Sequence, residues 1–150
     1  MSLKDGGIVH AGLIARRADG FWRGVLIEGP SGAGKSDLAL RMLSEGFRLV
    51  ADDRVVLWRS GGTLFGRAPD PLRGRIEVRG LDVVLTPSLA MAQIALVVRG
   101  GAPERIPQLQ HLEMLGISVP LVELDLREVS APAKLSRAFT LFDATHKRRI

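Results

Sequence analysis

The sequence contains no cysteine and no tyrosine, and aromatic residues make up only 5% of its 150 residues. The absence of cysteine excludes disulfides and thiolate metal sites, and we expect a reducing, cytoplasmic location. The scarcity of aromatic rings argues against a stacking platform for single-stranded nucleic acid. No apolar run approaches the ~20 residues that a membrane-spanning helix requires. The polar, glycine-containing N-terminus is not typical of a signal peptide.

The composition is that of one globular domain, with 46% hydrophobic and 25% charged residues. The net charge is +5, but the basic residues are scattered, apart from a tail at Lys147–Arg149 that we interpret as a solvated end. We therefore expect neither a nucleic-acid nor a membrane partner. His111, on a predicted helix, and His146, in the tail, form no zinc cluster.

One segment matches the phosphate-binding pattern G-x-x-x-x-G-K-[ST], and we call it the glycine loop. Its residues are Gly29, Pro30, Ser31, Gly32, Ala33, Gly34, Lys35 and Ser36. Its glycines allow the backbone N–H groups to turn inward around a polyphosphate. In such loops the lysine reaches the terminal phosphates and the hydroxyl that follows holds Mg²⁺. The pattern therefore predicts ATP and Mg²⁺ as cofactors; the alternative is a glycine-rich turn that binds nothing.

The segments on either side support this interpretation. Residues 24–28 form a short apolar run typical of a buried strand, and residues 35–45 have the apolar spacing of a helix that Gly46 ends. A strand, a glycine loop and a helix in this order place the partial positive charge of the helix N-terminus at the phosphates.

The rest of the chain predicts an α/β domain with a mixed sheet, because the first half offers only one crossover helix. We expect a helix at 134–142 and a short helix near 109–115 that Gly116 ends. Residues 73–80 lack an apolar stripe and are predicted to be surface or site. The expected strands cover 8–14, 24–28, 47–51, 55–58, 63–65, 81–85, 94–98 and 121–126.

Two carboxylates follow the apolar strand at 47–51. Asp52 and Asp53 come where a strand would end beside the glycine loop, which is where phosphoryl-transfer enzymes place a magnesium ligand or a catalytic base. Adjacent residues of an extended chain point to opposite sides, so the two are expected to have different tasks. One would face the phosphates while the other braces a loop or an arginine. The alternative is a solvated strand end with turn-forming aspartates.

Two further candidates are weaker on local sequence. Glu77 and Arg79 would share one face of an extended segment, where a carboxylate and a guanidinium can hold a magnesium–phosphate group. Local sequence alone favours a surface ion pair at this position. His10 lies on an apolar strand, where a histidine is more often structural than catalytic.

Several segments together resemble the catalytic domain of HPr kinase/phosphorylase over about residues 6–100. They are the glycine loop, Arg48–Arg54 with its "VADDR" piece, Ala68-Pro69, and Ile76–Leu81 with its "EVRG" piece. The resemblance implies a fold similar to phosphoenolpyruvate carboxykinase and a kinase that phosphorylates a serine of HPr, the phosphocarrier protein of the sugar phosphotransferase system. It also implies a homo-oligomer, since the family is hexameric.

Roles for individual residues come from the same resemblance. Lys35 would neutralise the β- and γ-phosphates, and Ser36 and Glu77 would be magnesium ligands. Asp53 would take the serine proton, and His10 matches the histidine that precedes the family's glycine loop. Arg79 lies within the family signature, and Arg105 corresponds to an arginine of a mobile loop near the site.

The chain also departs from the family pattern. We expect one catalytic domain over residues 1–150 without the family's N-terminal regulatory domain. Residues 126–129 lack the "RPGRN" pattern linked to the phosphorylase direction, so the resemblance supports the kinase direction and leaves the reverse reaction open.

Two other functions stay open at this point. Guanylate kinases begin with a nearly identical "GPSGAGK" loop, although no arginine-rich lid is evident here. A non-catalytic switch that binds ATP and an acidic partner would also carry the loop.

Overall fold

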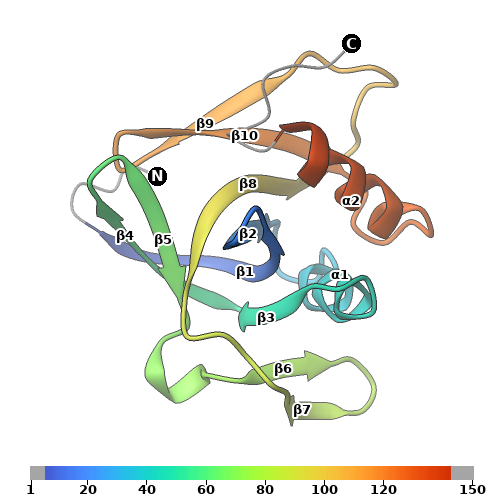
Figure 1. Cartoon of the computed structure of the whole chain (residues 1–150). Coiled ribbons are helices and arrows are strands. Elements are labelled where there is room, and N and C mark those ends of the chain that lie inside the picture. The colour runs from blue at the N-terminus through green and yellow to red at the C-terminus, as the bar shows by residue number, and fades with distance from the viewer. Residues whose placement is uncertain (1–5, 143–150) are drawn as a thin grey trace.

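The computed structural model describes residues 6–142. Most of their strands form one mixed sheet, and two α-helices lie on one side of it (Figure 1). The helices are α1 (Lys35–Leu43) and α2 (Ala131–Phe142), and a short 3₁₀ turn covers Asp70–Leu72. The strands are β1 (Gly7–Ala18), β2 (Phe21–Glu28), β3 (Arg48–Ala51), β4 (Arg54–Ser60), β5 (Thr63–Arg67), β6 (Arg75–Val78), β7 (Asp82–Leu85), β8 (Ala92–Gly100), β9 (Gln110–Met114) and β10 (Ile117–Leu124).

The main sheet runs β2-β1-β4-β5-β8-β10-β9, and β8 pairs with β2 as well as with β5. The strands β2, β1, β4, β5 and β8 therefore close into a ring. The pairs β2–β8 and β8–β10 are parallel, whereas β1 pairs antiparallel with β2, β3 and β4. This arrangement confirms the prediction of an α/β fold with a mixed sheet.

Two cores lie on opposite faces of the same strands. Leu13, Leu26 and Val97 point into the ring, whereas their neighbours Ile14 and Ile27 face the helices. The middle segments of β1, β2 and β8 are thus buried on both sides, which explains why residues 11–15, 25–27 and 94–98 are continuously apolar. The buried faces of α1 and α2 cover the second core and fix the position of the glycine loop that begins α1.

The predicted helix near 109–115 is wrong. Residues Gln110–Met114 form β9, which pairs antiparallel with β10 through Met114 and Ile117. Leu115 and Gly116 connect the two strands with φ angles of 50° and 79°, as in a two-residue hairpin turn of type I′. Gly116 is therefore a residue of a hairpin turn and does not end a helix. His111 lies on a strand.

The other predicted elements are present, most of them with longer bounds. The strand expected at 8–14 extends to Ala18, and the helix expected at 35–45 ends at Leu43. Gly46 follows this helix with a φ of 87°, the left-handed conformation expected where a helix stops.

A second, two-stranded sheet stands apart from the main one (Figure 1). It consists of β6 and β7, which pair antiparallel from Arg75 opposite Leu85 to Val78 opposite Asp82. Ile76 is buried and Val84 packs against the same core as α1. The predicted surface or site segment at 73–80 thus contains a strand, whose inward side chain Ile76 attaches the hairpin beside the glycine loop.

Within residues 6–142, neither helix has the length and apolarity needed to cross a membrane. His146 and the basic tail at Lys147–Arg149 lie outside the described residues.

Candidate active site

A cleft of about 700 Å³ opens between the glycine loop, His10 of β1, the end of β3, and the β6–β7 hairpin. Its walls carry four acidic and four basic side chains, so both an anionic ligand and the cations that accompany it meet opposite charges there. The residues that line it are His10, Ser31, Gly32, Gly34, Lys35, Ser36, Asp37, Asp52, Asp53, Leu72, Arg75, Glu77, Arg79, Val83 and Arg127.

The glycine loop has the backbone conformation that its sequence predicts. Gly32 and Gly34 have φ angles of 83° and 103°, in the left-handed region where a side chain would be strained. Gly34 is also the N-cap of α1, and no side chain caps that helix start. The N–H groups of the first turn are therefore available to an anion in the cleft.

Lys35 bends back over this loop. Its ammonium donates hydrogen bonds to the carbonyl oxygens of Gly29 at 2.7 Å and Pro30 at 3.0 Å, and the residue is only 8% exposed. Lys35 also lines the cleft, where its hydrogen-bond partners are these two neutral carbonyls. The position can therefore neutralise phosphate oxygens.

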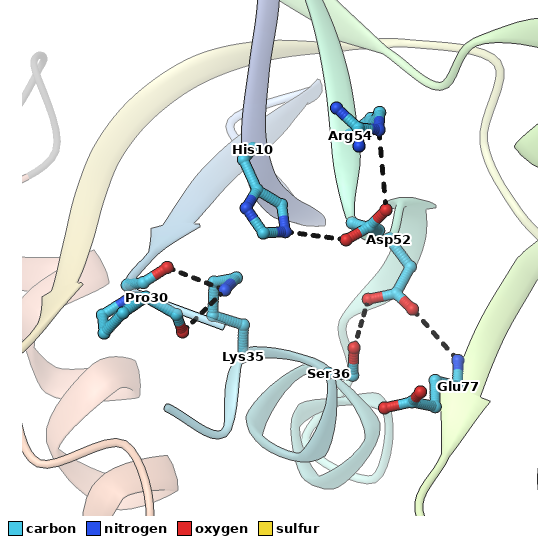
Figure 2. A network of polar contacts seen from close by, with 9 residues as sticks. His10, Pro30, Lys35, Ser36, Asp52, Arg54 and Glu77 are labelled. Carbon is cyan, nitrogen blue, oxygen red and sulfur yellow. Dashed lines mark hydrogen bonds and ion pairs between the residues drawn. The ribbon is translucent and has the colours of Figure 1, made fainter. Parts of the chain in front are cut away.

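Asp52, which follows β3, connects two other parts of the site, α1 and the β6–β7 hairpin (Figure 2). Its carboxylate accepts a hydrogen bond from the Ser36 hydroxyl at 2.7 Å and another from the Glu77 backbone N–H at 3.0 Å, and it is 7% exposed. It thus links α1 to the β6–β7 hairpin. Of the two adjacent carboxylates, Asp52 is the one that faces the glycine loop's serine.

Asp53 has an unusual backbone conformation for a residue other than glycine. Its φ is 73°, and the Arg54 N–H donates to the Asp52 carbonyl at 2.8 Å across it. This is a γ-turn with its central residue at positive φ, a rare and strained conformation that is found mostly at functional sites. The Ala11 N–H donates to the Asp53 carbonyl at 3.1 Å and holds the turn against β1.

The turn presents the Asp53 carboxylate to the cleft beside His10. The Asp53 Oδ1 atom lies 2.8 Å from the His10 Nε2 atom, and Oδ2 lies 3.7 Å from the Arg54 Nε atom. The Asp53 side chain is 54% exposed, so it is accessible to a ligand in the cleft. The sequence predicted different tasks for the two carboxylates, and in the structure both of them line one cleft.

Glu77 and Arg79 both line the cleft from the β6 side. Figure 2 shows the Glu77 carboxylate on the same side of α1 as the Ser36 hydroxyl. Ser36, Asp52 and Glu77 offer the hard oxygen donors that Mg²⁺ prefers. Among residues 6–142 no three His, Asp or Glu side chains form a complete metal cage.

Arg105 is the one candidate that lies away from the other site residues. It belongs to the exposed segment between β8 and β9, and the lining of the cleft does not include it. Its assignment to the site remains a prediction.

Arg127 is a site residue that the sequence did not reveal. It follows β10, lines the cleft, and donates from its guanidinium to the Gly32 carbonyl. Arg41 of α1 holds the same segment in place by donating to the carbonyls of Leu126 and Glu128. No local motif marks Arg127, because the contact joins residues 95 positions apart.

Fold and site together define a mixed α/β domain in which a glycine loop, a buried aspartate and an accessible aspartate share one cleft, the arrangement of phosphoryl-transfer proteins. Residues 9–140 match the family model described as the HPr serine kinase C-terminal domain. The chain belongs to this family. This finding confirms the resemblance stated from the sequence.

Individual relatives agree with the family model. The chain is 34% identical over 137 residues to an HPr kinase/phosphorylase from Enterococcus faecalis, an alignment that covers 86% of this chain and 43% of that protein. It is 36% identical over 130 residues to one from Neisseria meningitidis, covering 79% of this chain and 40% of the relative. The chain therefore spans about two fifths of the length of these relatives.

A solved structure supports the fold directly. The Hpr(Ser) kinase/phosphatase from Coxiella burnetii superimposes with a TM-score of 0.74 at 25% identity, covering 87% of this chain and 92% of that one. The mixed sheet with its flanking helices is thus the fold of an HPr kinase.

Proposed function

We propose that this domain binds ATP with Mg²⁺ and transfers the γ-phosphoryl group to a serine hydroxyl of an HPr-type phosphocarrier protein. One observation supports this function most strongly. The ammonium of Lys35, the Ser36–Asp52 pair and the accessible carboxylate of Asp53 line a single cleft. That is the set of groups that phosphoryl transfer requires, since catalysis of this reaction consists mainly of positioning and charge neutralisation.

The glycine loop would hold the phosphates of ATP. The free N–H groups at the start of α1 bind the phosphate oxygens, and Lys35 exchanges its carbonyl partners Gly29 and Pro30 for the β- and γ-phosphates. Arg79, on the opposite wall of the cleft, can take the oxygens of the transferred group in bidentate fashion.

Ser36 and Glu77 would hold Mg²⁺, with Asp52 behind the Ser36 hydroxyl. When bound, Mg²⁺ neutralises charge that develops on the β- and γ-phosphate oxygens. Asp52 fixes the Ser36 side chain, and it also fixes Glu77 through that residue's backbone N–H.

Asp53 would act as the catalytic base. As the bond forms between the serine oxygen and the γ-phosphorus, the bond from that phosphorus to the leaving oxygen of ADP breaks and the serine proton passes to Asp53. His10 orients the Asp53 carboxylate through its 2.8 Å contact and is a positioning residue in this scheme. We also predict that the protein regulates the phosphotransferase system, that it is cytoplasmic and that it assembles as a homo-oligomer.

The function is tested by incubating the chain with γ-labelled ATP, Mg²⁺ and purified HPr. We expect acid-stable label on a serine of HPr, and no label when Mg²⁺ is chelated. Acid-labile phosphohistidine, or an unlabelled HPr in the presence of active nucleotide binding, would contradict the proposal. The latter result would favour the ATP-dependent binding switch.

Arg127→Ala is expected to raise the KM for ATP about tenfold, because a charge-assisted hydrogen bond to the glycine loop, worth about 1.5 kcal/mol or more, is lost. Arg137→Ala, which removes a cation from the exposed face of α2, is the matched control. Steady-state kinetics with varied ATP measures both variants. Equal KM values for the two would show that Arg127 does not support the loop.

A further inference from the structure

The outward face of the β6–β7 hairpin has a polar half and an apolar half. Arg75 lies opposite Leu85, and Glu77 lies opposite Val83, so these four side chains share one face of the two-stranded sheet. Their inward neighbours Ile76 and Val84 pack against the core. The polar side chains come from β6, and the apolar ones come from β7 and from Leu81 in the turn before it.

These apolar side chains are unusually exposed. Leu81, Val83 and Leu85 are 74%, 54% and 77% exposed, and they are three of the ten large exposed apolar residues among those described. Three such side chains within five positions of one hairpin form a patch, which marks an interaction site more often than scattered apolar residues do. We call Leu81, Val83 and Leu85 the hairpin patch.

The hairpin patch borders the cleft. Val83 lines the cleft together with Asp53, Glu77 and Arg79. A second, more open hollow extends from Ser31 and Gly32 of the glycine loop along residues 77–83. A molecule that reaches Asp53 past this wall would therefore contact the hairpin.

The shape and chemistry of the patch suit a protein segment. Along a strand, the distance from residue 81 to residue 85 is about 13 Å, roughly the length of four extended residues. Triphosphate oxygens gain nothing from leucine side chains. Arg75, which pairs with Leu85 on the same face, adds a cation at the border of the patch that attracts a carboxylate.

We propose that the hairpin patch is the docking surface for the protein substrate, and that it binds apolar side chains next to the acceptor serine. This inference rests on the proposed kinase function and deepens it. The patch would hold the serine-bearing segment so that the hydroxyl enters the cleft toward Asp53, while Arg75 of β6 binds an acidic side chain at its border.

The test is the double variant Leu81→Ser/Leu85→Ser in the full chain. Both side chains are exposed, so their removal leaves the core intact. We expect the KM for HPr to rise about tenfold with kcat unchanged, and the Kd for ATP to stay within about twofold. The single variants should each give about a threefold rise if the two contacts act independently.

Phe21→Ser is the matched control. Phe21 is 62% exposed and lies at the start of β2, the opposite end of that strand from the glycine loop. This variant should keep the wild-type KM for HPr. Circular dichroism and sedimentation of all variants check the fold and the assembly state.

Three other outcomes would overturn the docking proposal. An unchanged KM for HPr in the double variant shows that the patch does not bind the substrate. A parallel loss of ATP affinity assigns the patch to the nucleotide, and a change in assembly state assigns it to a second copy of the chain. A wild-type chain that binds HPr yet labels no serine would instead contradict the proposed kinase function, so the two failures are distinguishable.

Discussion

Asp53→Asn is expected to lower kcat for serine phosphorylation about 10³-fold while leaving the affinity for ATP within about twofold. An amide is nearly the same size as the carboxylate and can still accept a hydrogen bond from His10, but it cannot take the serine proton. The Asp53 oxygen lies 2.8 Å from the His10 Nε2 atom, and the amide can preserve this contact. The loss would therefore report proton acceptance and not a displaced side chain.

Measurement of kcat by phosphoserine formation, and of nucleotide Kd by direct titration, separates the two effects. Asp70→Asn is the matched control, because the Asp70 side chain is 90% exposed and is not part of the lining of the cleft. Wild-type kcat in Asp53→Asn would remove Asp53 as the base. Loss of ATP binding in this variant would make it a ligand for the nucleotide instead.

Lys35→Ala is expected to lower kcat/KM for ATP by about 10³-fold. The variant removes the buried cation of the cleft and both hydrogen bonds to the carbonyls of Gly29 and Pro30. The nucleotide should bind at least about tenfold more weakly, because a buried cation contributes more to phosphate binding than an exposed one.

Nucleotide titration and steady-state kinetics measure both quantities for Lys35→Ala. Thermal melting shows whether the loop's lost hydrogen bonds also lower the stability of the domain. Arg137→Ala again serves as the control for the loss of one positive charge. Unchanged ATP affinity and turnover in Lys35→Ala would contradict the assigned role of the glycine loop.

The sequence predicted the parts of the site that depend on local chemistry. The glycine loop could be identified because its conformation requires particular residues at fixed spacing, and Gly32 and Gly34 indeed have positive φ angles. The strand before it and the helix after it are buried on the faces that their apolar residues indicate. The aspartates after β3 could also be identified from local sequence, because they directly follow an apolar run that is typical of a buried strand.

Contacts between distant residues could not be predicted in this way. The spacing of Leu112, Met114 and Leu115 suits a helix as well as a strand over so few residues, and pairing with β10 decides between them. The same limit applies to Arg127, whose partner Gly32 is far away in the sequence. It applies also to the γ-turn at Asp53, which the neighbouring strands β1 and β4 impose.

The structure gives the two aspartates different surroundings. Sequence reasoning predicted opposite directions along an extended strand, whereas the γ-turn brings both carboxylates to the same cleft. Asp52 is held by Ser36 and by the β6 backbone and is buried, so it suits a supporting task. Asp53 is accessible, which a group that must meet a serine hydroxyl requires.

The most direct test of the account is a structure of this chain bound to HPr, Mg²⁺ and a non-hydrolysable ATP analogue. We predict that the acceptor serine oxygen lies within about 2.6–3.2 Å of an Asp53 carboxylate oxygen, in line with the γ-phosphorus. A complex in which Asp53 points away from the serine, while the glycine loop holds the phosphates, would contradict the central claim.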